Sequence, residues 1–164
     1  MIIRILRRND ARKLITLKKT LDSETIFMMY EAGERKDCII ETENEIVTLN
    51  RNNSIILGCE IDTKLVGYLS GEKGEFNRNK HVLYITIGIL KEYHGKNIGK
   101  KLFSELEKWA KNNSIKRLEL SVIIYNERTI QLYKSVGFEI EGIRKESICY
   151  KKRFVSEYYM AKIL

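Results

Sequence analysis

The chain has 164 residues, of which 43% are hydrophobic and 32% are charged, and its formal net charge is +8. This composition is that of a globular protein and excludes a disordered chain. No stretch approaches the roughly 20 apolar residues of a membrane span, and the N-terminus lacks the apolar run of a signal peptide. We therefore expect one cytoplasmic domain over residues 1–164, without a membrane partner.

The first fifty residues predict a strand and two helices. Ile3 and Ile5 alternate with a polar residue, which indicates a short strand, and Asp10 is placed to cap a helix whose leucines share one face. Residues 24–40 lack a clean period, so we expect a loop with short helical turns. A second helix is expected over about 41–51.

The middle of the chain predicts an antiparallel meander followed by a helix. Two β-rich runs at 54–60 and 64–70 are separated by three residues of hairpin character, and a third strand is expected over about 82–90. The clearest helix covers about 98–112, because its apolar residues step by four, four and three: Ile98, Leu102, Leu106 and Trp109.

The last third predicts a strand, a helix and two more strands. Residues 118–122 alternate as in a half-buried strand, and the helix that follows covers about 126–135 before Gly137. The final strands are expected at 138–149 and 154–163. The resulting order, β α α β β β α β α β β, describes an α/β fold with a mixed sheet covered by helices.

The turn between the strand at 82–90 and the helix at 98–112 carries the strongest chemical signal. Gly95 and Gly99, with Asn97 between them, permit left-handed backbone angles and a close approach to an anion. The free N–H groups and the positive dipole end of the following helix point at the same turn. We expect a phosphate-binding turn, to which Lys96, Lys100 and Lys101 add positive charge.

The spacing in this turn excludes two other phosphate-binding motifs. A P-loop needs four residues between its glycines and a Ser or Thr after the Lys, whereas Gly95 and Gly99 enclose three residues and Lys100 precedes Lys101. The dinucleotide motif G-x-G-x-x-G is absent, because no glycine lies two residues after Gly95. Nucleotide hydrolysis and hydride transfer are therefore disfavoured.

The strand and turn resemble the acyl-CoA pyrophosphate loop of the GNAT N-acetyltransferases, whose pattern is Q/R-x-x-G-x-G/A. His94 stands where the family has Gln or Arg, and Asn97 stands at the first motif glycine. Asn tolerates left-handed angles, so we expect the loop shape to persist. The second family pattern, N-x-x-A-x-x-L-Y-x-x-x-G-F, is similar to residues 126–138, although Ile130 falls one residue after the usual alanine. The resemblance implies a GNAT-like fold with a mixed, mostly antiparallel sheet flanked by helices.

The resemblance also implies acetyl-CoA as cosubstrate and a set of residues that would hold it. An irregular strand end, such as a bulge, would offer backbone groups to the pantetheine and the carbonyl, with ordinary sheet pairing as the alternative. Asn126 would either contact pantetheine or cap its helix. The expected strand residues are Ile87, Gly88 and Ile89, and those of the pyrophosphate loop are His94, Gly95, Lys96, Asn97, Ile98, Gly99 and Lys100.

Tyr133 is the candidate general acid. It lies seven residues after Asn126, two helical turns along, so both can face one cleft. An ordinary tyrosine pKa of about 10 keeps the hydroxyl protonated and able to donate to a departing thiolate. The alternative is a tyrosine packed on the helix with its hydroxyl hydrogen-bonded.

The acceptor side carries weaker signals. No carboxylate occurs over residues 81–90, so we expect water-mediated removal of the amine proton rather than a base on this strand. Arg35 could bind an acceptor carboxylate or pair with Glu31. Four carboxylates in segments that would border the acceptor are candidates to hold a cationic amine or relay its proton: Glu31, Glu34, Glu72 and Glu75.

No metal or disulfide is expected, because Cys38, Cys59 and Cys149 are widely spaced and His81 and His94 lack ligand spacing. The resemblance to the GNAT family implies direct acetyl transfer from acetyl-CoA to an amine in a ternary complex, and we expect a primary amine of a small molecule as the acceptor. The alternatives are a protein N-terminus or lysine as acceptor, a CoA sensor without turnover, and a basic nucleic-acid-binding module. The last lacks any recognised nucleic-acid-binding motif. A monomer and a homodimer both remain open.

Overall fold

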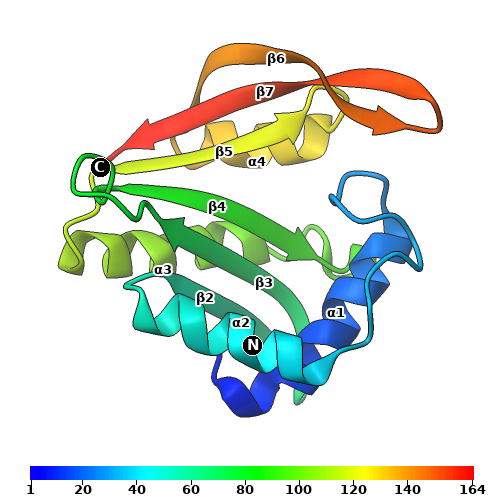
Figure 1. Cartoon of the computed structure of the whole chain (residues 1–164), viewed down its shortest axis with the longest axis vertical. Coiled ribbons are helices and arrows are strands. Elements are labelled where there is room, and N and C mark those ends of the chain that lie inside the picture. The colour runs from blue at the N-terminus through cyan, green and yellow to red at the C-terminus, as the bar shows by residue number, and fades with distance from the viewer.

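A seven-stranded sheet in the order β1-β2-β3-β4-β5-β7-β6 runs through the protein, and the computed structural model describes residues 1–164 (Figure 1). The strands are β1 (Ile2–Ile5), β2 (Ile55–Ile61), β3 (Lys64–Lys73), β4 (Val82–Ile89), β5 (Arg117–Ile123), β6 (Glu139–Tyr150) and β7 (Arg153–Ile163). The helices are α1 (Ala11–Glu24), α2 (Ile39–Arg51), α3 (Ile98–Asn112) and α4 (Glu127–Ser135), with short 3-10 turns η1 (Arg8–Asp10) and η2 (Lys91–Tyr93).

The predicted order of helices and strands is confirmed, with shifts at some boundaries. β2, β3 and β4 form the expected antiparallel meander, and its first turn has positive φ at Asp62 and Thr63. This matches the right-handed twist of a hairpin. β3 runs three residues further than expected, because its pairing with β4 continues to Lys73 opposite Leu83. None of the helices combines the length and apolar character needed to cross a bilayer.

Helices cover both faces of the sheet: α1 and α2 lie on one face, and α3 and α4 on the other (Figure 1). On the α1 face the packing is close enough that a Cβ added at Gly88 would lie 2.6 Å from a methyl group of Leu21. On the other face, Leu102, Phe103 and Leu106 of α3 are fully buried. This burial accounts for the strong apolar period of α3 in the sequence.

The two halves of the sheet separate between β4 and β5. These strands form the only parallel pair, and their pairing covers just residues 82–84 opposite 117–119. Beyond Tyr84 the strands diverge (Figure 1). The backbone of β4 beyond Tyr84 therefore has no neighbouring strand on its β5 side, although β4 lies in the middle of the sheet.

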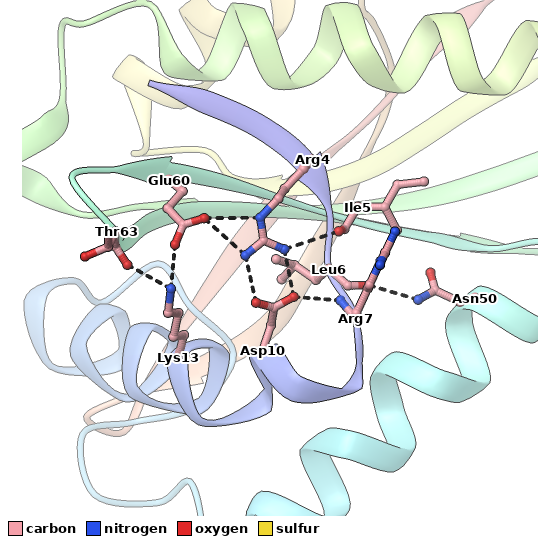
Figure 2. A network of polar contacts seen from close by, with 9 residues as sticks. All are labelled: Arg4, Ile5, Leu6, Arg7, Asp10, Lys13, Asn50, Glu60 and Thr63. Atoms are coloured by element: carbon pink, nitrogen blue, oxygen red, sulfur yellow. Dashed lines mark hydrogen bonds and ion pairs between the residues drawn. The ribbon is translucent and has the colours of Figure 1, made fainter.

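A network of ion pairs fixes the N-terminal strand against α1 and β2 (Figure 2). The Arg4 guanidinium donates to both carboxylate oxygens of Asp10, at 2.8 and 2.7 Å, and to Glu60 at 3.1 Å. Lys13 of α1 donates to Glu60 and to the carbonyl of Thr63. This network holds together β1, the start of α1 and β2.

The expectation that the Asp10 side chain caps α1 is wrong. Asp10 does precede the helix, but its carboxylate makes no capping bond to α1. It accepts instead from the backbone N–H of Arg7, at 2.8 Å, and from Arg4. The bidentate, charge-assisted pair with Arg4 is stronger than a single bond from a helix N–H, which explains the choice.

Asp10→Asn is expected to destabilise the protein by roughly 1–3 kcal/mol, the usual cost of a lost charge-assisted bond. The hydrogen bond from Arg4 holds the pKa of Asp10 below its ordinary value. Its stabilising effect is therefore complete above the ordinary carboxyl pKa of about 3.9 and is lost as the pH falls through the lower folded-state value. Thermal unfolding followed from pH 7 to pH 2.5 measures this.

The matched control is Glu43→Gln, which removes the exposed ion pair with Arg8 and should change the midpoint little. An Asp10→Asn deficit that stays constant down to pH 2.5 would contradict the assignment of the stabilisation to the ionised carboxylate.

Candidate active site

A cleft of about 1020 Å³ opens where β4 and β5 diverge. Its walls come from the C-terminal half of β4, the end of β5, the first turn of α3, the helix α4, and the residues that end and follow α1. This volume is at the upper end of the range for small-molecule pockets. The space can accommodate an extended ligand arm together with a second, smaller molecule.

The turn before α3 presents an unusual run of free backbone donors. The N–H groups of the six residues 95–100 have no acceptor within the chain, and the first backbone bond of α3 runs from Lys101 to the carbonyl of Asn97. The expected left-handed conformation is confirmed at Asn97, with φ of 59°, and at Gly95, with φ of 78°. Free donors at a helix N-terminus bind phosphate oxygens well.

The basic residues of the turn differ in where their side chains lie. Lys100 lines the cleft, as does Lys91, which the sequence reasoning missed. Lys96 does not, because its Nζ lies 4.6 Å from the centre of the Tyr93 ring. His94 lines the cleft, and its Nε2 bonds the carbonyl of Ile89 at 2.8 Å. This bond holds the turn against the end of β4.

The left-handed conformation predicted for Gly99 is wrong, because this residue has no positive φ, whereas its close approach to an anion stays a prediction. A Cβ at this position would lie 2.5 Å from a methyl group of Leu132 on α4, so the glycine permits close packing of α3 on α4. A Cβ at Gly95, in contrast, would meet nothing within 4 Å. The positive φ of Gly95 favours glycine there, whereas the missing side chain of Gly99 leaves room for Leu132.

The expected bulge at Ile87, Gly88 and Ile89 is also wrong, because these residues pair with β3 in unbroken register. The other edge of β4 is the open one. The N–H of Leu90 donates to Val66 of β3, so by alternation the backbone groups of Ile87 and Ile89 point away from β3 into the cleft. The early end of the β4–β5 pairing is an irregular, splayed strand end of another kind, and its contact with pantetheine stays a prediction.

Tyr133 lies in the wall of the cleft on the α3 face. Its ring is buried edge-on against Phe103, with centroids 5.9 Å apart, and Phe138 lies 5.8 Å away. No residue of the chain hydrogen-bonds its hydroxyl, and no buried side-chain polar atom in the structure lacks a partner, so the hydroxyl opens onto the cleft. Burial raises the pKa of Tyr133 above its ordinary value and keeps the hydroxyl protonated.

Asn126 lines the cleft and caps α4. Its side-chain oxygen accepts from the backbone N–H of Thr129 at 3.4 Å. The capping alternative is thus confirmed, and contact with pantetheine stays a prediction.

The predicted acceptor residues do not line the cleft. Arg35 binds the buried carboxylate of Asp22, at 2.6 and 3.2 Å, and lies over the ring of Tyr30. Its expected pairing with Glu31 is therefore wrong. Glu31 is exposed, and its backbone N–H bonds the Glu34 carboxylate.

Glu72 and Glu75 lie at the far end of β3, beside a separate hollow. Because β3 runs antiparallel to β4, this end lies where β4 begins and not where it opens toward β5.

The cleft contains polar residues that the sequence reasoning missed. Tyr84 of β4, Ser121 of β5 and Glu157 of β7 all line it. Glu157 is 5% exposed although it is ionisable. Glu157 could have been found in the sequence, because it is the only acidic residue in the last predicted strand, which is rich in apolar and aromatic residues.

Residues 16–138 match the model of the acetyltransferase (GNAT) family. The chain belongs to this family. It is an N-acetyltransferase by class, and its mixed α/β sheet is the GNAT fold.

Among the relatives of this GNAT chain is an L-amino acid N-acetyltransferase of Escherichia coli, 31% identical over 109 residues, which are 66% of this chain and 67% of that protein. A GNAT acetyltransferase from Streptococcus pneumoniae has the same fold, with a TM-score of 0.94 at 26% identity over 99% of this chain and 98% of that one. A third, from Salmonella typhimurium and described with its cofactor acetyl-CoA, has a TM-score of 0.89 at 18% identity, covering 100% and 94% of the two chains.

Lys100→Ala is expected to weaken acetyl-CoA binding by about 0.5–1 kcal/mol, or roughly two- to fivefold in Kd, because an exposed lysine beside the free N–H groups loses its attraction to pyrophosphate. Calorimetric titration at two salt concentrations measures the Kd for acetyl-CoA. The dependence of this Kd on salt should be weaker in the variant than in wild type. The control is Lys101→Ala, an exposed neighbour outside the cleft. Equal losses in both variants would show that only net charge matters.

Proposed function

We propose that this GNAT enzyme transfers an acetyl group directly from acetyl-CoA to a primary amine of a small molecule, within a ternary complex. The observation that carries the proposal is the run of free backbone N–H groups over residues 95–100. These residues lie in the turn before α3, which forms one wall of the cleft. It offers donors to the pyrophosphate of CoA, and the helix dipole adds to the attraction.

The open edge of β4 supports the placement of the reacting arm. Pantetheine contains two amide groups, which can pair with the cleft-facing backbone of Ile87 as a neighbouring strand would. The acetyl carbonyl would then lie between β4 and β5, near a backbone donor that can stabilise a tetrahedral oxyanion. Tyr133 would protonate the departing thiolate from the α3 face.

The lining of the other face favours a small, cationic acceptor. Phe27, Met28 and Met29 contribute an apolar wall from the segment after α1, and Glu157 contributes a carboxylate. Arg35, the cation expected there, is engaged by Asp22 and lies outside the cleft. A protein N-terminus is the second candidate acceptor, and a peptide in the assay panel separates the two.

Acetyl-CoA at a hundredfold excess over its Kd is expected to stabilise the protein by about 2.7 kcal/mol, a rise of roughly 5–10 °C in Tm. The same preparation is then tested for release of the CoA thiol with spermine, kanamycin, single L-amino acids and a tripeptide. An unchanged Tm at millimolar acetyl-CoA would contradict the cosubstrate assignment. Acetylation of the tripeptide alone would assign a protein acceptor.

Tyr133→Phe is expected to lower kcat by about 10²-fold or more, with little change in acetyl-CoA affinity, because it removes the acid and preserves the packed ring. The loss will be smaller where amine deprotonation or product release limits the rate. Steady-state kinetics and a binding titration check both quantities. The control is Tyr125→Phe, which is exposed and outside the cleft. Weaker binding with normal kcat would make Tyr133 a cosubstrate contact instead.

A further inference from the structure

A continuous chain of hydrogen bonds crosses the sheet on the α1 face of the cleft. The Tyr84 hydroxyl lies 3.0 Å from the Ser121 hydroxyl, which donates to Glu157 Oε1 at 2.7 Å. The Ser147 hydroxyl donates to Glu157 Oε2 at 2.8 Å. The chain thus links β4, β5, β7 and β6, and its first three members line the cleft.

We propose that this chain removes the proton from the acceptor amine: Tyr84 takes it from the amine, and Glu157 is its final acceptor. The inference rests on the proposed acetyl transfer and adds the base that this reaction needs. It replaces the expectation of removal by water alone. Tyr84 is the catalytic residue, while Ser121 and Glu157 act through it as positioning residues that orient its hydroxyl and accept its proton.

The direction of the hydrogen bonds follows from counting donors. An ionised carboxylate only accepts, so the single hydroxyl proton of Ser121 is committed to Glu157. Tyr84 must therefore be the donor in its bond with Ser121. Its own proton then points along the chain, and the lone pairs of its oxygen are free toward the cleft. A bound ammonium group can donate to this oxygen.

The surroundings of Glu157 are donors, which leave its carboxylate as the acceptor at the end of the chain. The carboxylate is buried, and besides the two serine hydroxyls it has Arg144 Nη1 at 3.4 Å. The register of β6 against β7 is irregular between Arg144 and Ile148, and this irregularity brings both Arg144 and Ser147 to the carboxylate. The cleft is also lined by other titratable groups, among which the carboxylate of Glu24 accepts from the backbone N–H of Lys91. The full set is Glu24, Tyr84, Lys91, Tyr93, His94, Lys100, Arg128 and Tyr133.

Tyr84 and Tyr133 reach the opening from opposite faces of the sheet. Tyr84 shares its face with Gly88, which packs on α1, whereas Tyr133 packs on Phe103 of α3. A proton can thus leave the amine on one face while another reaches the thiolate on the other. Separate environments for acid and base are the usual way in which one site performs both steps at neutral pH.

The proposed step balances without a further reactant. An N–H bond of the ammonium group breaks and an O–H bond forms on Tyr84, while the Tyr84 proton passes to Ser121 and the Ser121 proton passes to the Glu157 carboxylate. The neutral amine then attacks the thioester carbonyl with its lone pair. Glu157 later returns the proton to water through the cleft.

The test compares Tyr84→Phe, Ser121→Ala and Glu157→Gln with wild type from pH 6 to pH 10.5, with spermine as the first acceptor and the other amines of the panel after it. At pH 7 each variant is expected to lose about 10²-fold in kcat with an unchanged KM for acetyl-CoA. The defect should shrink as the pH passes the pKa of the amine, about 10.4 for an alkylamine, because the amine then arrives neutral. A purely structural role would not produce this pH dependence.

One further variant and one independent readout keep the test decisive. Ser121→Thr retains a hydroxyl and is expected to keep activity where Ser121→Ala loses it. If Glu157→Gln fails to fold because Arg144 loses its partner, Tyr84→Phe still decides, since Tyr84 is 37% exposed and loses only one oxygen.

Two outcomes would overturn the inference in distinguishable ways. An active wild type with an equally active Tyr84→Phe, or with a defect that is independent of pH, overturns the hydrogen-bonded chain alone. No thiol release by wild type with any amine overturns the proposed function, and this inference with it.

Discussion

The site depends on the place where β4 stops pairing with β5. Three residue pairs hold the two halves of the sheet together, and beyond Tyr84 the backbone of β4 is unpaired on one edge. Unpaired backbone groups inside a protein are costly, so they persist only where a ligand or water completes them. The same divergence opens the cleft, exposes the free donors before α3, and allows side chains from both faces to reach one point.

The free donors before α3 and the buried carboxylate of Glu157 lie at different parts of this opening. Free N–H groups and Lys100 lie at the turn before α3, where CoA would bring negative charge. The buried carboxylate of Glu157 lies on the opposite side of the sheet opening, where the acceptor would bring positive charge. The net charge of +8 is therefore a poor guide to the acceptor, because it says nothing of where a single buried acid lies.

The wall next to the acceptor is held by ion pairs far apart in sequence. Arg35 and Asp22 tie the segment after α1 back to that helix, and Arg4, Asp10 and Glu60 fix the start of α1 against β1 and β2. Phe27 and Met28 are placed in the cleft by the first of these pairs, since both lie in the segment that it closes. Arg35 thus has a structural role that its sequence context did not reveal.

The sequence by itself determined the order of helices and strands, the left-handed turn at Gly95 and Asn97, and the position of Tyr133. Each depends on local periodicity or on residues within one turn, and such patterns are visible along the chain. The tertiary structure alone decided that Gly99 lies against Leu132, that Glu157 enters the cleft, and that Arg35 pairs with Asp22. Those outcomes depend on which strands and helices become neighbours, and in particular on β7 lying beside β5, which brings Glu157 to Ser121 across 36 residues.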